Sequence, residues 1–315
     1  SPRARALAAL MTERLRRPDR RHDGGDCGCA ALGRRCVSEL LPAQAWALWE
    51  AGLAGGLVGH LSVGSGKTLA GVLAPLVIPH CRRAVLLVPP KLVGQLVSEY
   101  LAYREHLRVP QLALPDGSRL EGWPGEPELA VVPYSRLSLP ESTQLLEELA
   151  PDAVIADEAH HLRSRESART RRLLRLYLRR PETRLLAWSG TITGKSLRDL
   201  AHLCALALCE GSPLPLDPDE VEWWAAVVDP SDWPAPPGAL RRLAGGGVDV
   251  REGLRARLVE TRGFVSTASA ISCSASVVLR ERRPPPTPPA VQEALARVRR
   301  TWERPDGEEL VEATE

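Results

Sequence analysis

Residues 64–68 read G-S-G-K-T, and this stretch decides the fold that we predict for the chain. A short apolar segment, 55–61, precedes it and a helix-like run, 69–78, follows, so we expect a strand, a loop and a helix. In such a unit the glycines let successive backbone N–H groups turn toward a phosphate, and the helix N-terminus adds partial positive charge. The residues expected to hold the phosphates are Gly64, Ser65, Gly66, Lys67 and Thr68.

Two of these side chains have separate expected roles. Lys67 would reach the outer phosphates of a nucleotide, and the Thr68 hydroxyl would be an oxygen ligand for Mg²⁺. The strict eight-residue consensus begins with glycine, whereas this chain has Leu61 at that position. The alternative interpretation is a glycine-rich loop that only connects two elements.

A second motif follows the apolar run 153–156, which ends in D-E-A-H, residues 157–160. A buried strand that delivers two adjacent carboxylates is hard to explain as packing, because burying unpaired charge is costly. We expect Asp157 to hold Mg²⁺, and Glu158 to orient and deprotonate the water that attacks a terminal phosphate. Together with G-S-G-K-T, this motif predicts nucleotide hydrolysis.

Three more short apolar runs, 84–88, 129–133 and 184–188, are typical of buried parallel strands. The predicted fold is therefore α/β, with a parallel central sheet flanked by helices. Polar residues follow the second run: Tyr134, Ser135 and Arg136 could hold a sugar-phosphate backbone or cap the next helix. Hydroxyls at Ser189 and Thr191 could contact the acidic strand end and transmit hydrolysis to other parts of the protein.

Gln44 lies on a predicted helix, 39–51, about twenty residues ahead of G-S-G-K-T. Its primary amide can donate and accept at once, which suits the edge of adenine. A glutamine on a helix is otherwise an ordinary surface residue, and both interpretations stay open here.

Charge and composition limit the partners. The formal net charge of +2 gives no bulk signal for nucleic acid, so any such contact needs local clusters. One cluster follows D-E-A-H and is explained either by a solvated helix face or by contact with a nucleic-acid backbone. It comprises Arg163, Arg165, Arg169, Arg171, Arg172, Arg175, Arg179 and Arg180. The sequence shows no apolar run of about eighteen residues and no secretory leader, so we expect an intracellular protein without a membrane span.

The first 38 residues form a polar, arginine-rich arm that we expect to be solvated and partly mobile, with a phosphate-backbone contact as the alternative. The seven cysteines of the chain are odd in number and scattered, which favours reduced thiols. Cys27, Cys29 and Cys36 hint at a zinc site, and incidental thiols in a surface loop are the alternative.

Four regions follow from these observations: the arm 1–38, an ATP-binding lobe 39–210, an extension 211–282 rich in proline and tryptophan, and a spacer with a charged tail, 283–315. Within the extension, residues 251–265 are expected to be helical and then extended. The spacer begins with a polyproline run, which is stiff.

The order of these motifs resembles superfamily 2 helicases, specifically the Swi/Snf-type translocases of double-stranded DNA, over about residues 40–210. Phage-borne and bacterial helicase-like ATPases are similar. The resemblance implies the first of two RecA-like lobes, with duplex DNA as partner. It implies ATP at Gln44, Lys67 and Thr68, and Mg²⁺ and catalysis at Asp157 and Glu158. It also implies coupling at His160, Ser189 and Thr191, and DNA contacts near Lys91 and Tyr134.

The chain departs from the family pattern in two ways. Ile192 stands where proline is common, and no Q-x-x-G-R-x-x-R-type motif follows residue 200. That motif supplies the arginine fingers of the second lobe, so we expect the second lobe in a longer parent chain or on a partner, and slow hydrolysis by this chain alone. The alternatives are a lobe of a restriction-type or packaging translocase, or a truncated non-catalytic scaffold module. The motifs are compatible with strand separation and with duplex tracking.

Overall fold

The computed structural model describes residues 2–19, 39–191, 196–229, 240, 249–267 and 293. The chain divides into two compact units, Ser1–Ile271 and Ser272–Glu315, and every element below belongs to the first unit. The cysteine group at residues 27–36, Ile192 and the polyproline spacer lie outside the described residues.

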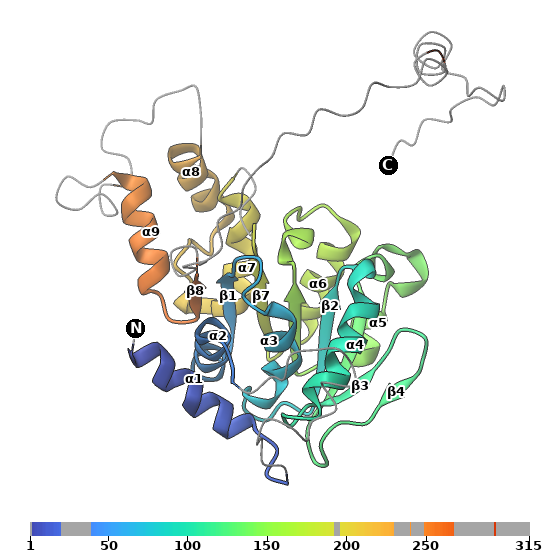
Figure 1. Ribbon diagram of the computed structural model, residues 1–315. Helices are drawn as coiled ribbons and strands as arrows, with labels where there is room; N and C mark the ends of the chain where they lie inside the picture. The colour runs from blue at the N-terminus through green and yellow to red at the C-terminus, as the bar shows by residue number, and fades with distance from the viewer. Residues whose placement is uncertain are drawn as a thin grey trace. The chain divides into compact units, whose positions relative to one another are not determined.

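Among the described residues, eight strands form one sheet in the order β4-β3-β5-β2-β6-β7-β1-β8 (Figure 1). Neighbouring strands pair in parallel except β3 and β4, which are antiparallel. The strands are β1 (Leu57–His60), β2 (Arg83–Val88), β3 (Gln111–Ala113), β4 (Arg119–Leu120), β5 (Glu128–Pro133), β6 (Ala153–Asp157), β7 (Arg184–Ser189) and β8 (Phe264–Ser266). The predicted α/β fold with a parallel central sheet is confirmed.

Helices connect these strands, as parallel pairing requires. They are α1 (Pro2–Leu15), α2 (Pro42–Ala54), α3 (Lys67–Leu73), α4 (Val93–Tyr103), α5 (Leu145–Leu149), α6 (Ala168–Arg179), α7 (Arg198–Leu208), α8 (Pro218–Val228) and α9 (Val250–Glu260). Short 3-10 turns add η1 (Ala74–Leu76), η2 (Pro90–Leu92), η3 (Arg136–Ser138), η4 (Pro140–Ser142), η5 (Ala159–Leu162) and η6 (Cys209–Gly211). The phosphate-loop helix stops early at Leu73 and continues as η1, because Pro75 breaks its hydrogen-bond ladder.

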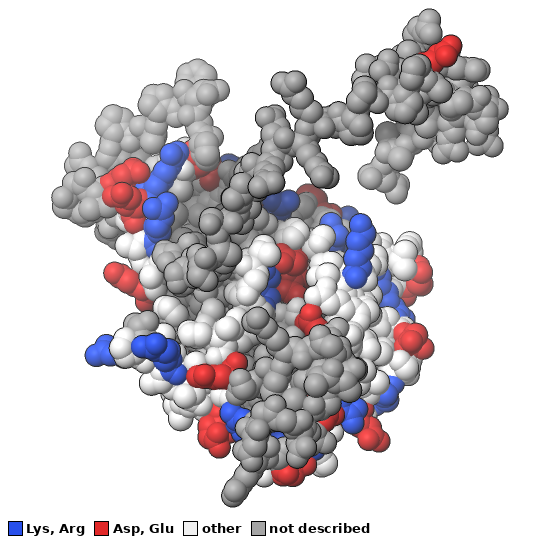
Figure 2. Space-filling model, in the orientation of Figure 1, with Lys and Arg blue, Asp and Glu red and all other residues white. Residues whose placement is uncertain are grey.

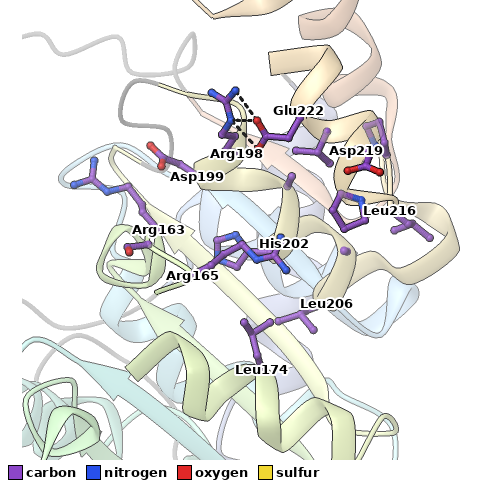
Figure 3. Close-up of a pocket in the computed structure, with 16 residues that line it drawn as sticks. Arg163, Arg165, Leu174, Arg198, Asp199, His202, Leu206, Leu216, Asp219 and Glu222 are labelled. Atoms are coloured by element: carbon purple, nitrogen blue, oxygen red, sulfur yellow. Dashed lines mark hydrogen bonds and ion pairs between the residues drawn. The ribbon is translucent and has the colours of Figure 1, made fainter. Parts of the chain in front are cut away.

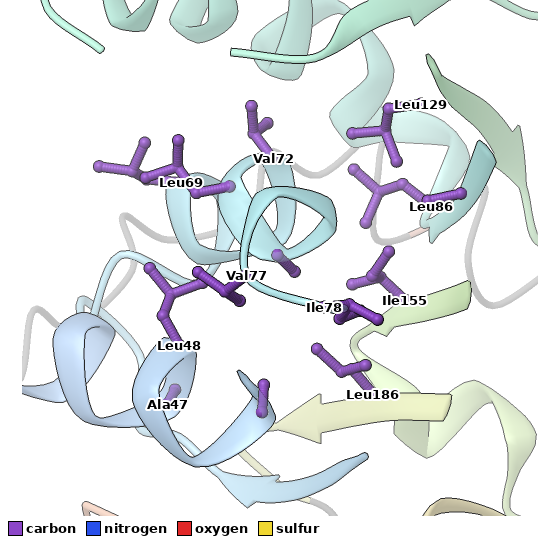
Figure 4. Packing of buried hydrophobic residues seen from close by; sticks show 14 of the residues in the cluster. Ala47, Leu48, Leu69, Val72, Val77, Ile78, Leu86, Leu129, Ile155 and Leu186 are labelled. Carbon is purple, nitrogen blue, oxygen red and sulfur yellow. The ribbon is translucent and has the colours of Figure 1, made fainter. Parts of the chain in front are cut away.

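The central strands are buried on both faces, which is why they read as continuous apolar runs. Along β2, Leu86 belongs to one apolar cluster, while Val85 and Leu87 belong to the cluster on the opposite face. Helices α1–α4 contribute to the first cluster and α5–α9 to the second. Figure 4 shows the first cluster, where Leu69 and Val72 project from α3 and Leu86 of β2 lies beside Leu129 of β5.

For residues 2–15, the expectation of a solvated, partly mobile arm is wrong. They form α1, whose Ala8, Met11 and Leu15 are each 1% exposed and face the core instead of solvent. The Thr12 hydroxyl accepts a hydrogen bond from the backbone N–H of Leu40, which ties α1 to the start of α2. Spacings of three and four residues place these side chains on one helix face, a pattern that the neighbouring arginines obscured.

Beyond residue 210, the expected order of helix and then extended chain is confirmed by α9 and β8. Because β8 pairs with β1, this extension shares the sheet of the preceding lobe. Over the part of the chain that the structure describes, no helix is both long and apolar enough to cross a membrane. The same residues contain no cluster of three or more His, Cys, Asp or Glu that could hold a metal ion.

Candidate functional site

The candidate site lies where β6, β7 and β1, three neighbouring strands, reach their carboxyl ends. The phosphate loop, defined here as residues 61–66, leaves β1 and enters α3. Gly64 and Gly66 have φ of 83° and 72°, the left-handed region that favours glycine. A Cβ on Gly66 would come within 2.1 Å of the Gln44 amide nitrogen, whereas a Cβ on Gly64 would meet nothing within 4 Å. Glycine is therefore required at position 66, because its φ is left-handed and because a Cβ would clash with Gln44.

Lys67 and the acidic strand end lie together, as the motifs predict. The Lys67 ammonium is 3.3 Å from a carboxylate oxygen of Glu158, and these side chains are 10% and 22% exposed. The same ammonium donates to the carbonyl oxygens of Leu61 and Ser62, at 3.3 and 3.4 Å. It is thus anchored by one carboxylate and by the first turn of its own loop.

Asp157 is 4% exposed, and burial raises its pKa to about 6. The adjacent Glu158 charge raises the pKa further, while Lys67 and the hydrogen bonds to the carboxylate oppose the shift. Its Oδ1 accepts hydrogen bonds from the indole Nε1 of Trp188, at 3.1 Å, and from the backbone N–H of Glu158, at 3.0 Å. Trp188 was not predicted as a site residue from the sequence; its signal is an indole N–H on a buried strand, which needs an acceptor.

Glu158 breaks the strand. Its φ of 54° and ψ of 52° are left-handed, an unfavourable conformation for a residue with a Cβ, and it turns the chain into η5. Desolvation alone would raise its pKa, but the hydrogen bond from Ser189 and the charge of Lys67 outweigh it and lower the pKa below the ordinary value. Glu158 is therefore ionised at neutral pH.

Of the three residues predicted to act in coupling, His160 and Ser189 contact Glu158, and Thr191 contacts Ser189. The Ser189 hydroxyl donates to Glu158 at 2.9 Å and accepts from the backbone N–H of Thr191 at 3.1 Å. The Nδ1 atom of His160 is 2.9 Å from the Ser189 oxygen and 3.2 Å from Glu158. Because the single hydroxyl proton of Ser189 goes to Glu158, Nδ1 must carry a proton to bond the serine oxygen. The side chains of His160 and Ser189 thus contact the same carboxylate.

Gln44 is 5% exposed, so it is not a surface residue. Its Oε1 accepts from the backbone N–H of Leu41 at 2.7 Å, as in a capping box. Its Nε2 donates to the carbonyl oxygen of Gly66 at 2.9 Å. In the structure the amide therefore braces the phosphate loop, and a contact with adenine stays a prediction.

The two predicted DNA-contact residues differ from each other. Lys91 is exposed. Tyr134 is 1% exposed, and its hydroxyl donates to the carbonyl oxygen of Asp157 at 2.9 Å. The side chain of Tyr134 is therefore inside the protein and supports the acidic strand end, and a DNA contact near this residue stays a prediction.

The arginine cluster after D-E-A-H divides in a way that neither predicted interpretation covers. Arg172 is buried and donates to the carbonyl oxygen of Leu137, while Arg175 pairs with Glu147 and donates to the carbonyl oxygen of Thr143. These arginines fasten α6 to residues 137–147. On the face shown in Figure 2, Lys and Arg are interspersed with Asp and Glu over the described surface.

Arg163 and Arg165 remain exposed and line a cavity of about 510 Å³ between the segment after η5, α6, α7 and α8 (Figure 3). His202 of α7 also lines it, and its Nε2 lies 2.8 Å from the carbonyl oxygen of Leu162. Burial lowers the pKa of His202.

The family model described as DEAD/DEAH box helicase matches residues 42–200, half of the chain. The chain belongs to this family. The match runs from α2 to the start of α7, so it includes the phosphate loop, the D-E-A-H turn and Ser189 of this helicase domain.

Solved structures similar to the helicase domain have low sequence identity. The SWI2/SNF2 ATPase core of Sulfolobus solfataricus, in complex with dsDNA, is 16% identical with a TM-score of 0.46, over 73% of this chain and 45% of that one. The UvsW helicase of bacteriophage T4 is 12% identical with a TM-score of 0.36, over 50% of this chain and 56% of that one. The type ISP restriction-modification enzyme LlaGI is 14% identical with a TM-score of 0.34, over 48% and 17%. The chain thus spans less than half the length of the SWI2/SNF2 core, and no curated protein matches it.

The residues of the helicase domain fit a nucleotide with Mg²⁺. The Ser65 hydroxyl oxygen is buried inside the phosphate loop and has no hydrogen-bond partner among the described residues. Mg²⁺ prefers hard oxygen donors. The Thr68 hydroxyl, next to Lys67 on α3, and the Asp157 carboxylate, next to Glu158 at the end of β6, are two such donors. A divalent cation would also compensate the buried charge of Asp157.

Proposed function

We propose that this chain binds ATP with Mg²⁺, hydrolyses it, and forms the first motor lobe of a nucleic-acid-dependent ATPase. The observation that carries the proposal is the 3.3 Å contact between Lys67 and Glu158, beside the buried Asp157. This contact joins the phosphate loop to an acid pair at the carboxyl ends of the central strands.

Lys67 supplies positive charge to the phosphates. Its ammonium has carbonyl partners in Leu61 and Ser62 that phosphate oxygens can replace, because both kinds of partner accept hydrogen bonds. Gln44 keeps Gly66 in place and is the residue proposed to contact adenine. Bound Mg²⁺, held by Thr68 and Asp157, supplies charge neutralisation at the phosphates.

Glu158 is proposed as the general base. It is ionised, because its pKa is lowered, and it can therefore orient a water molecule and accept its proton. Ser189 and His160 hold the same carboxylate, so a change in the partners of Glu158 during hydrolysis alters both contacts. We propose that this is how the nucleotide state reaches the loop at Thr191.

The nucleic-acid partner is proposed to be duplex DNA. Membership of a helicase family supports a nucleic acid, and the exposed Lys91, Arg163 and Arg165 supply cations that follow β2 and β6 in the chain. A second RecA-like lobe, in a longer chain or on a partner, would provide the arginine fingers, whose absence costs about 10³–10⁵ in rate. We therefore propose slow hydrolysis by this chain alone.

The experiment measures ATP binding by calorimetry and phosphate release with and without duplex DNA. We expect ATP binding with Mg²⁺ and slow release that Glu158→Gln abolishes. Glu182→Gln is the matched control, because Glu182 is exposed and pairs with Arg180. Absence of ATP binding would contradict the proposal and leave the non-catalytic scaffold module as the explanation.

A further inference from the structure

Thr267 lies at the end of β8, outside the range matched by the helicase family model. It is 3% exposed, and its backbone N–H donates to the carbonyl oxygen of His60 at 3.0 Å. This bond continues the parallel pairing in which His60 of β1 is opposite Ser266 of β8. The residue is therefore held beside the point where β1 passes into the phosphate loop.

The Thr267 hydroxyl extends that ladder beyond both strands. Its oxygen accepts from the backbone N–H of Ser62 at 3.0 Å and lies 3.0 Å from the Ser62 hydroxyl. A side chain thus takes the place that a backbone carbonyl has within a ladder. The sequence separation of 205 residues explains why no local pattern indicated this pair.

Ser62 is itself part of the phosphate loop, and its carbonyl oxygen contacts Ser65 and Lys67. Its carbonyl oxygen accepts from the backbone N–H of Ser65 at 3.2 Å and from the Lys67 ammonium at 3.4 Å. On the other side, the backbone N–H of Leu61 donates to the carbonyl oxygen of Ser189 at 3.2 Å. The first turn of the loop is therefore held between β7 and the end of β8.

We propose that Thr267 is a positioning residue for nucleotide binding, acting through Ser62 to keep the phosphate loop in its binding conformation. The inference rests on the proposed function, because it assumes that this loop binds ATP. Loss of the hydroxyl would leave the Ser62 N–H without its acceptor, so the loop would adopt other conformations that nucleotide must reorder on binding.

The test compares affinities for the non-hydrolysable analogue AMP-PNP with Mg²⁺, measured by titration calorimetry on the full chain. Thr267→Val keeps the β-branched shape and removes the hydroxyl, whereas Thr267→Ser keeps the hydroxyl. Thr183→Val is the matched control. Thr183, the residue before β7, is also 3% exposed, and its hydroxyl donates to the carbonyl oxygen of Pro151, which precedes β6. This contact lies at the amino-terminal ends of the strands, opposite the phosphate loop.

We expect Thr267→Val to weaken AMP-PNP binding about three- to tenfold, the worth of one hydrogen bond. We expect Thr267→Ser to stay within about twofold of wild type and Thr183→Val to lower the melting temperature without changing affinity. Equal affinity of Thr267→Val and wild type would overturn the inference alone, as would equal weakening by Thr183→Val. A wild-type chain that does not bind AMP-PNP would instead overturn the proposed function.

Hydrogen–deuterium exchange of the wild-type chain tests the same contact without a variant. Because coupling is reciprocal, AMP-PNP with Mg²⁺ should slow exchange at residues 264–267 as well as in the phosphate loop. Residues 180–183 should be unaffected. Unchanged exchange at 264–267, together with protection of the phosphate loop, would contradict the role of Thr267.

Discussion

Strand β6 has an aspartate at each end, and the two carboxylates have different surroundings. Asp152, just before the strand, accepts from the backbone N–H groups of Arg82 and Arg83 at 2.8 and 2.9 Å. Asp157, its last residue, is buried beside Glu158, and its pKa is raised to about 6. Fixed backbone donors at the start of β2 satisfy the first carboxylate, whereas the second is the proposed ligand of Mg²⁺. The difference separates a structural acid from an acid with a proposed function.

The largest expected effect is at the functional end. Glu158→Gln removes the proposed base and should lower the rate of phosphate release about 10²–10⁴-fold, the usual contribution of general base catalysis. Single-turnover measurement with saturating ATP checks this, and ATP affinity should change little. Asp152→Asn, at the other end of β6, should leave the rate unchanged. Equal losses of rate in both variants would remove the distinction between the two ends of β6.

Lys67→Met should weaken ATP binding about 10- to 100-fold, because charge-assisted hydrogen bonds to the phosphates are lost. Lys91→Met is the matched control at the end of β2. It should leave ATP affinity unchanged, weaken DNA binding modestly and reduce the salt slope of that binding by about one. Calorimetry with ATP and fluorescence anisotropy with labelled duplex at several salt concentrations measure both effects. Loss of ATP affinity in Lys91→Met would contradict the assignment.

The two aspartates should respond with opposite signs to the same substitution. In EDTA at pH 8, Asp157→Asn should raise the free energy of unfolding by up to about 3 kcal/mol, since a carboxyl with a folded pKa of about 6 and an ordinary pKa of 3.8 is charged there at a cost. The gain should fall as pH drops from about 6 and disappear below about 4, where the wild-type carboxyl is protonated.

Asp152→Asn should instead lower the free energy of unfolding by about 0.5–1 kcal/mol, because two charge-assisted hydrogen bonds become neutral. Urea unfolding of both variants between pH 4 and 8 checks the signs. Destabilisation by Asp157→Asn in EDTA would show that the buried charge is already compensated within the protein.

The smallest expected effect concerns His202 of α7, whose Nε2 lies 2.8 Å from the carbonyl oxygen of Leu162. Burial lowers its folded pKa, so its contribution to stability is present above the unfolded value of about 6.5 and is lost as pH falls through the folded value. His202→Gln should make the free energy of unfolding less dependent on pH in this window. The raised pKa of Asp157 changes the free energy of unfolding with pH in the opposite direction. His202→Gln is therefore compared with wild type, which has the same Asp157.

Much of the site could be predicted because its chemistry is local in sequence. Lys67 and Thr68 belong to one short loop, and Asp157 and Glu158 end a strand that is visible as an apolar run. The inward side chains could not be predicted. Gln44 contacts Gly66, 22 residues away, and Trp188 contacts Asp157, 31 residues away, and neither pair forms a pattern along the chain.

Tyr134 shows the limit of reasoning from strand ends. A polar residue after a strand can point to solvent or turn beneath the next strand, and only the packing of β5 against its neighbours decides which. The same holds for Arg172, whose charge indicates solvent or a phosphate, although its guanidinium is buried and donates to the carbonyl oxygen of Leu137 and the hydroxyl of Thr143.

By itself the sequence determined the central strands β1, β2, β5, β6 and β7, the phosphate loop and the acid pair, because hydrophobic periodicity and glycine geometry act over a few residues. Only the tertiary structure decided that β8 lies beside β1, that α1 joins the core, and that Thr267 contacts Ser62. These contacts join segments far apart in the chain, and they form when apolar surfaces of many elements are buried together.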